Sequence, residues 1–170
     1  MLEYDDAIFQ IDLDRVREIA AARQALHLNH RSRRALSDNY EIYGVAGEMA
    51  FSKWSFHPMD ESSRPGGDQY DFLIRERPID IKTAQKAYYL LVEPRRLKKD
   101  MIYVLAQFNP PDRVHLLGWQ TGLAMSHMPI RDFGRGIPSH FQSRSTLRSM
   151  DALWNDLRLH TEIMANAKHT

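Results

Sequence analysis

The sequence predicts an α/β or α+β domain in which one β-sheet packs against helices. Apolar residues recur at helical spacing towards both ends of the 170-residue chain, and short apolar runs of strand length fill its middle. Polar stretches rich in Pro, Gly and Ser separate these segments. The length suits one core, and no repeat or linker divides the chain. We therefore expect residues 1–170 to form a single domain.

Three segments are expected to be helical. Residues 12–36 and 40–54 each carry an apolar stripe, and the polar "SDN" at 37–39 separates them. A third amphipathic helix is expected over 147–165. The stripes consist of Val16, Ile19, Ala20 and Leu26, then Ile42, Val45, Ala46 and Met49, and finally Leu147, Met150, Leu153, Trp154 and Leu157.

The middle of the chain is expected to supply the strands. Residues 69–74 and 79–84 read as a hairpin, because only "RERP" separates them and the stretch before them, 57–68, is a polar loop. Residues 101–108 are apolar almost throughout, which indicates a strand buried on both faces. Two further strands are expected at 87–93 and 113–121, whereas 129–146, with two Gly and two Pro, is expected to be irregular.

The composition narrows the class of protein. Charged residues make up 26% of the chain and the net charge is +1, which neither requires nor excludes a nucleic-acid partner. Without cysteine, disulfides and cysteine-ligated zinc or iron–sulfur sites are excluded. No apolar run approaches the roughly 20 residues that span a bilayer, so we expect no membrane partner. The acidic N-terminus lacks a signal-peptide pattern, so an intracellular, cytoplasmic location is expected.

The hairpin is expected to gather charged side chains on one face. Closing it with a four-residue loop at 75–78 places Leu73 opposite Asp80 and Asp71 opposite Lys82. A slip by one residue would bury these charges in the core, which is costly. The opposite face then carries the apolar set Phe72, Ile74, Ile79 and Ile81, with Ile74 opposite Ile79.

Two readings of this charged face stay open from the geometry alone. Two neighbouring carboxylates repel each other unless something positive lies between them. A hard divalent cation such as Mg²⁺ would offset this repulsion, since it binds one or two protein carboxylates together with water and phosphate oxygens. Alternatively, Asp71 and Lys82 form an ordinary cross-strand salt bridge and Asp80 is solvated.

Three stretches bear a family resemblance. "GVAGEMAF" (44–51), "YDFLI" (70–74) and "IDIKT" (79–83) resemble the PD-(D/E)xK nuclease superfamily, although Tyr70 stands where the family name has proline. The resemblance implies a restriction-endonuclease-like core, a central mixed β-sheet flanked by helices. It also implies a helix between the later strands, which the sequence does not show clearly.

The resemblance also implies roles for single residues. Asp71 and Asp80 would bind Mg²⁺ or Mn²⁺ together with the backbone carbonyl of Ile81, Glu48 would be an accessory carboxylate on a helix, and Lys82 would be the catalytic lysine. The implied activity is a metal-dependent deoxyribonuclease. The alternative is a catalytically inactive nucleic-acid-binding or assembly subunit with the same fold.

Other residues are weaker candidates. Asp68 is an alternative to Asp71 but follows two glycines and is read as a turn residue. Gln85 is either an assisting polar group or the polar end of a strand. His27 and His30 have helical spacing without further ligands, so zinc is not expected.

Basic clusters are the candidate DNA-binding residues, since cations contact phosphates. The partner is expected to be DNA, with a homodimer as a further possibility if the apolar stripe of the last helix is not core. The tryptophans are expected in the core. The first cluster is Arg31, Arg33 and Arg34, the second is Arg95, Arg96, Lys98 and Lys99, and a looser set is Arg131, Arg135, Arg144 and Arg148.

Gly44 and Gly47 lie within an expected helix, where each costs roughly 1 kcal/mol relative to alanine. Close approach of another backbone, from a sheet or from nucleic acid, would explain why both are tolerated.

Overall fold

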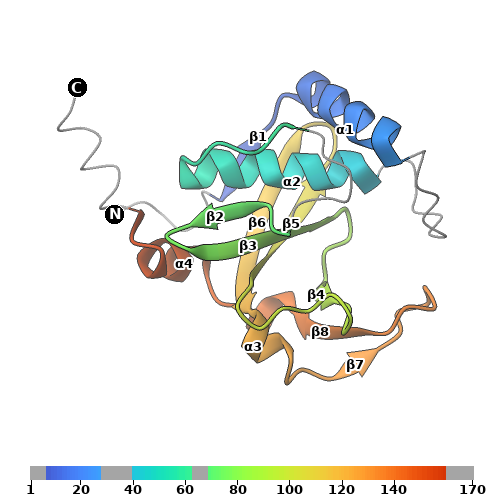
Figure 1. Cartoon of the computed structure of the whole chain (residues 1–170), viewed down its shortest axis with the longest axis vertical. Coiled ribbons are helices and arrows are strands. Elements are labelled where there is room, and N and C mark those ends of the chain that lie inside the picture. The colour runs from blue at the N-terminus through green and yellow to red at the C-terminus, as the bar shows by residue number, and fades with distance from the viewer. Residues whose placement is uncertain (1–6, 28–39, 63–68, 160–170) are drawn as a thin grey trace.

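The computed structural model describes residues 7–27, 40–62 and 69–159 (Figure 1). Expected features beyond these ranges, including Arg31, Arg33, Arg34, His30 and Asp68, lie outside the described residues. The helices are α1 (Leu13–His27), α2 (Tyr40–Ser55), α3 (Gly122–Met125) and α4 (Met150–Asp156), with a 3-10 turn η1 (Arg144–Thr146). The strands are β1 (Ile8–Gln10), β2 (Phe72–Ile74), β3 (Arg77–Ala84), β4 (Tyr89–Val92), β5 (Ile102–Asn109), β6 (Arg113–Thr121), β7 (Ile130–Arg131) and β8 (Ser139–Ser143).

The centre of the fold is a mixed five-stranded sheet with the order β1-β6-β5-β3-β2. Strands β3 and β5 are parallel, and the other neighbours are antiparallel. Helices α1 and α2 lie on one side of this sheet, and the small sheet β4-β8-β7 lies on another side together with α3 (Figure 1). The α/β class and the mixed sheet flanked by helices are therefore confirmed.

Helix α2 forms the centre of the larger hydrophobic core. Its expected range of 40–54 agrees with the observed Tyr40–Ser55, because its apolar residues repeat at strict helical spacing. The helix packs on β3, β5 and β6. Val45, Ala46 and Phe51 are fully buried there against Ile79 and neighbouring residues of the sheet.

Strand β5 separates two cores, as its apolar sequence predicts. Val104 and Ala106 belong to the core under α2, whereas Tyr103 and Leu105 belong to a second core. The second core is closed by residues of the small sheet, including Leu90 of β4. The expected burial of 101–108 on both faces is therefore confirmed, apart from the half-buried Gln107.

Several elements differ from the expectation. The segment 129–146 was expected to be irregular but contains β7, β8 and η1, and neither β1 nor α3 was expected. These elements have two to five residues, too few to show a periodic pattern, and their neighbours in the fold stabilise them. The expected strand at 69–74 is shortened to β2, and the last helix begins three residues late, where Ser149 caps its N-terminus.

The connection between the parallel strands β3 and β5 also differs from the family pattern. It contains β4, which leaves the main sheet and pairs with β8, instead of a helix. The restriction-endonuclease-like core consequently stays a prediction. The strand expected at 87–93 is present as β4.

The last helix and the tryptophans belong to the core within the described residues. Leu153 and Leu157 are buried, so this part of the stripe is not a free dimer face. Trp119 is completely buried, and Trp54 packs edge-on against Trp154 at 5.5 Å between ring centroids.

None of the helices in the described part of the chain is both long and apolar enough to cross a membrane.

Candidate active site

The β2–β3 hairpin closes with a two-residue turn at Arg75 and Glu76, whose φ angles are 49° and 62°. Two left-handed residues are typical of the turn that matches the twist of paired strands. The observed register pairs Phe72 with Ile79 and Leu73 with Pro78, so the expected four-residue loop was wrong. The error is a shift of two residues, which moves partners along the strand and leaves each side chain on its face.

The apolar face of the hairpin is therefore the expected one. Phe72, Ile74, Ile79 and Ile81 are all buried in the core under α2. The cross-strand pairs differ from the expected pairs, however. The paired residues end at Phe72–Ile79, so Asp71 lies just outside the ladder, near the charge of Asp80, and is not paired with Lys82 as expected.

Asp71 terminates the hairpin ladder. Its backbone N–H donates to the carbonyl oxygen of Ile79 at 2.9 Å, and its Oδ2 accepts a hydrogen bond from the backbone N–H of Ile81 at 2.7 Å. The carboxylate thus does what a backbone carbonyl would do if β2 were longer. In an antiparallel ladder the N–H and C=O of one residue point to the same neighbour, so the Ile81 carbonyl also faces this end of β2.

Asp80 and Lys82 lie on one face of β3 and form an ion pair. The distance from Lys82 Nζ to Asp80 Oδ2 is 2.5 Å, and the side chains are 37% and 21% exposed for Lys82 and Asp80 respectively. Lys82 Nζ also lies 5.9 Å from the centre of the Tyr103 ring on β5. The lysine is thereby held over the sheet face away from α2, while solvent still reaches it.

Glu48 is buried on α2 and is bound by Arg23 of α1. Both terminal guanidinium nitrogens, Nη1 and Nη2, donate to the Glu48 carboxylate, each at 2.9 Å, and Nη2 also donates to the carbonyl oxygen of Asp60. A two-pronged pair of this kind orients the carboxylate and offsets its burial. Arg23 therefore fixes the carboxylate that the family resemblance singles out.

Arg23 is a site residue that sequence reasoning missed, although a signal was present. It follows Val16 by seven residues and Ala20 by three, so it falls on the buried stripe of α1. An arginine on an apolar stripe needs a buried acid as its partner. Glu48 is that acid.

Electrostatics link the carboxylates to each other. Burial raises the pKa of Asp71 well above the ordinary aspartate value, and the charges of Glu48 and Asp80 raise it further. The Ile81 N–H and the Lys82 charge oppose this pKa shift. Burial also raises the pKa of Glu48, with Arg23 opposing and Asp80 adding to the effect. The four residues Glu48, Asp71, Asp80 and Lys82, called the charged cluster below, thus act on one another.

The donor set of this cluster fits a hard divalent cation. It offers carboxylate oxygens from Asp71 and Asp80 and the carbonyl of Ile81, and Mg²⁺ binds through one or two protein carboxylates and otherwise through water and phosphate. A bound cation would also reverse the mutual repulsion that raises the pKa of Asp71. Among the described residues, no three His, Asp or Glu side chains stand ready to hold a metal by themselves.

The second basic cluster lies beside the charged cluster. Arg95, Arg96, Lys98 and Lys99 are exposed on the connection between β4 and β5. Lys98 Nζ donates to the backbone carbonyl of Gln69 at 3.2 Å, two residues before Asp71. This contact places the basic connection next to the segment that leads into the hairpin.

Gly47 allows the close packing that positions α2. A Cβ atom there would lie 1.8 Å from Thr83 Oγ1 and 3.2 Å from Ile81 Cγ2. The expected close approach is thus made by β3 at Gly47. It is not made at Gly44, where the described residues leave open space around such an atom.

Gln85 is exposed at the end of β3 and accepts a long hydrogen bond of 3.4 Å from the Tyr43 hydroxyl. Its side chain contacts α2 in this way.

Comparison of the chain with protein-family models, curated proteins and solved structures finds no match. The fold and the site therefore define the class: an α/β protein with carboxylates and a lysine gathered where an edge hairpin ends.

Proposed function

We propose that the protein is a Mg²⁺- or Mn²⁺-dependent deoxyribonuclease. The observation that supports this most is the convergence of Glu48, Asp71, Asp80 and Lys82 from α2, the segment before β2, and β3. Buried carboxylates such as Asp71 and Glu48, whose pKa burial and neighbouring carboxylates raise, are typical of functional sites more than of solvated sheet faces.

Each residue of the charged cluster has its own role in the proposed reaction. Asp71 and Asp80 hold the ion with the Ile81 carbonyl, and Glu48, oriented by Arg23, adds negative charge behind Asp71. A divalent ion so held polarises a phosphodiester and lowers the pKa of water. Lys82 carries three donors and a positive charge, with which it orients the attacking water and stabilises negative charge on the phosphate.

The exposed basic cluster supports a nucleic acid as the substrate. Lys98 contacts Gln69, and the exposed Arg95, Arg96 and Lys99 follow on the same connection, so a phosphate backbone that enters the charged cluster would contact this connection. We place the activity in the cytoplasm, where DNA and Mg²⁺ are both available.

The test is a DNA digest in Mg²⁺ and in Mn²⁺. We expect Asp80→Asn and Lys82→Ala each to lower the cleavage rate at least about 100-fold, the scale on which lost electrostatic groups reduce catalysis. Asp14→Asn is the matched control, because the Asp14 side chain on α1 is 94% exposed. Equal cutting by the wild type and all three variants would end the assignment.

An inactive nucleic-acid-binding or assembly subunit is the second candidate. The observation that favours it is that protein cations already bind two of the carboxylates: Lys82 binds Asp80 at 2.5 Å and Arg23 binds both oxygens of Glu48. Calorimetric titration with Mn²⁺ separates the two. Heat that disappears in Asp80→Asn supports the nuclease, and DNA binding without metal binding supports the subunit.

A further inference from the structure

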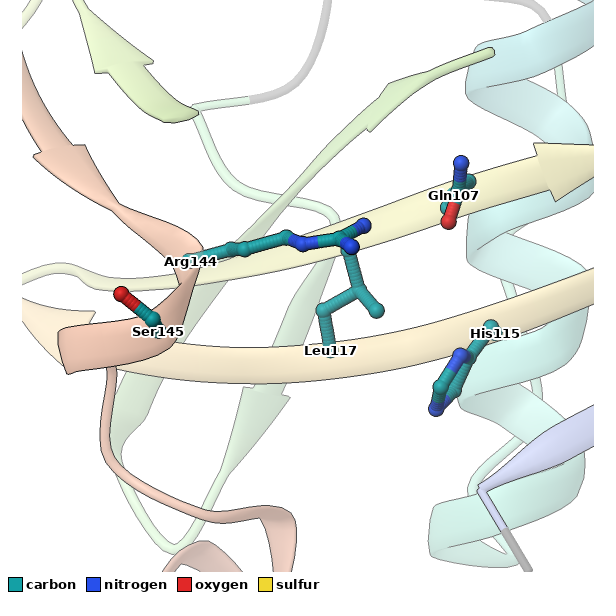
Figure 2. A pocket seen from close by; sticks show the side chains of 5 residues that line it. All are labelled: Gln107, His115, Leu117, Arg144 and Ser145. Carbon is teal, nitrogen blue, oxygen red and sulfur yellow. The ribbon is translucent and has the colours of Figure 1, made fainter. Parts of the chain in front are cut away.

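A hollow of about 360 Å³ lies where η1 meets the main sheet (Figure 2). Figure 2 shows the Arg144 side chain extended from η1 above Leu117, in the direction of Gln107. The hollow is partly open to solvent. It is lined by Gln107 of β5, His115 and Leu117 of β6, and Arg144 and Ser145 of η1.

The lining favours a negatively charged, polar ligand. It contains a guanidinium, an imidazole, an amide and a hydroxyl, and no carboxylate. Within the ranges that the structure describes, Arg144 takes part in no ion pair, whereas it lies beside an aromatic ring. A cation placed over a hollow without an acidic partner attracts an anion.

The hollow shares a sheet face with the charged cluster. Lys82 is level with Leu105 in the parallel β3–β5 pair, and Ala84 is level with Gln107. Gln107 is therefore two residues beyond the level of Lys82 on the same face, which is about 7 Å along the strand. Gln107 is in turn level with His115 on β6. The hollow and the charged cluster are thus close along the sheet, while Leu105, which is level with Lys82 on this face, is buried in the second core.

Tyr88 adds an exposed ring next to Arg144. The Arg144 backbone N–H donates to the Tyr88 carbonyl oxygen at 3.0 Å, and the Arg144 guanidinium carbon lies 5.8 Å from the centre of the Tyr88 ring. Tyr88 is 58% exposed. A half-open ring beside an arginine suits a nucleobase stacked on the ring with its phosphate at the guanidinium.

We propose that this hollow and Tyr88 form a nucleotide subsite for a single strand of nucleic acid, with Arg144 binding a phosphate and Tyr88 stacking a base. The volume is at the lower end of the range for small-ligand pockets, so it admits one nucleotide. A base paired within a duplex does not offer its face for stacking. The identity of the strand as part of a substrate rests on the proposed nuclease function, but the binding itself does not.

The experiment measures binding of labelled single-stranded and duplex DNA of one sequence by fluorescence anisotropy in EDTA, with the full chain. Tyr88→Ala is expected to weaken single-strand binding at least about 5-fold, the lower range for loss of one stacked base, while Tyr88→Phe keeps it. Arg144→Ala is expected to weaken it and to reduce the slope of log K against log salt by about 0.7. Arg17→Ala on α1, which removes the same charge from an exposed site, is expected to change neither.

Every outcome of this experiment either supports the subsite or overturns it. Unchanged affinity and salt slope in Arg144→Ala, an equal loss in Arg17→Ala, or an equal loss for duplex and single strand would overturn the subsite. The digests distinguish its failure from that of the nuclease. If Asp80→Asn cuts like wild type while Arg144→Ala and Tyr88→Ala lose single-strand binding, the subsite stands and the nuclease fails. If only the Asp80 and Lys82 variants have effects, the nuclease stands and the subsite fails. Unchanged thermal unfolding of the Tyr88 and Arg144 variants confirms that both fold.

Discussion

The contact between α2 and β3 is closest at Gly47, and an added methyl group there tests how tightly the helix carrying Glu48 is held. In Gly47→Ala the new Cβ would lie 1.8 Å from Thr83 Oγ1, 3.1 Å from Thr83 Cβ and 3.2 Å from Ile81 Cγ2. Rotation of the Thr83 side chain relieves the first contact but not the other two. Helix α2 must therefore shift from the sheet by a few tenths of an ångström.

Two opposing effects set how much Gly47→Ala changes the free energy of unfolding. Overpacking of a filled core costs about 1–3 kcal/mol. Replacing a mid-helix glycine by alanine returns up to about 1 kcal/mol. We therefore expect the free energy of unfolding to fall by about 1–2 kcal/mol, which for a chain of this size lowers Tm by roughly 2–8 °C.

Thermal and urea unfolding followed by circular dichroism measure this effect. Gly44→Ala is the matched control on the same helix: nothing described lies within 4 Å of its added Cβ, so it should stabilise by about 0.5–1 kcal/mol. The double variant Gly47→Ala/Thr83→Ala should recover only the part of the loss that the Thr83 Oγ1 contact causes, since the contacts with Thr83 Cβ and Ile81 Cγ2 remain. Removing the hydroxyl itself breaks no hydrogen bond among the described residues. Equal stabilisation by the two glycine replacements would refute the close contact.

Two further predictions concern the buried carboxylates. Folding raises the pKa of Asp71, so the folded state binds more protons above the ordinary aspartate pKa, and the free energy of unfolding falls as pH rises towards the folded pKa. Asp71→Asn keeps an acceptor for the Ile81 N–H, so its free energy of unfolding in urea should be larger than that of the wild type at neutral pH. This difference should shrink as pH falls from the raised pKa of folded Asp71 to the ordinary aspartate pKa, about 4, and stay constant below it. Arg23→Met should cost about 3 kcal/mol by leaving Glu48 buried without its partner, and the double variant with Glu48→Gln should recover much of that loss.

The elements predicted well are those whose pattern depends on their own residues. Helix α2 and strands β5 and β6 are long enough for the period of the apolar residues to fix type and extent. The shorter β1, β7 and β8 exist because of partners far away in sequence. Ile8 pairs with His115, for example, and Ile130 pairs with His140. No local pattern contains that information.

The charged cluster shows the same division. Asp80 and Lys82 lie on one face because they are two positions apart on a strand. This can be predicted without knowledge of any other strand. The partner of Glu48 depends on how α1 crosses α2, which the sequence leaves open. Arg23 nevertheless lies on the apolar stripe of α1, where a cation needs a buried acid, so a search for charged residues on apolar stripes would have found half of the pair.

The hairpin shows why a wrong register still led to the right group of side chains. The apolar set Phe72, Ile74, Ile79 and Ile81 stays on one face after any even shift, so hydrophobic pattern alone cannot separate a four-residue loop from the observed two-residue turn. The two-residue shift of the register does change which charged groups lie near one another. It leaves Asp71 just outside the paired residues and near the charge of Asp80, leaves Lys82 to pair with Asp80 along its own strand, and lets the Asp71 carboxylate bind the Ile81 N–H. Asp71 near Asp80 is repelled by that carboxylate, whereas the expected Asp71–Lys82 pair would have attracted it; Lys82 bound to Asp80 offsets part of the repulsion, and the divalent ion of the proposed function would offset more of it.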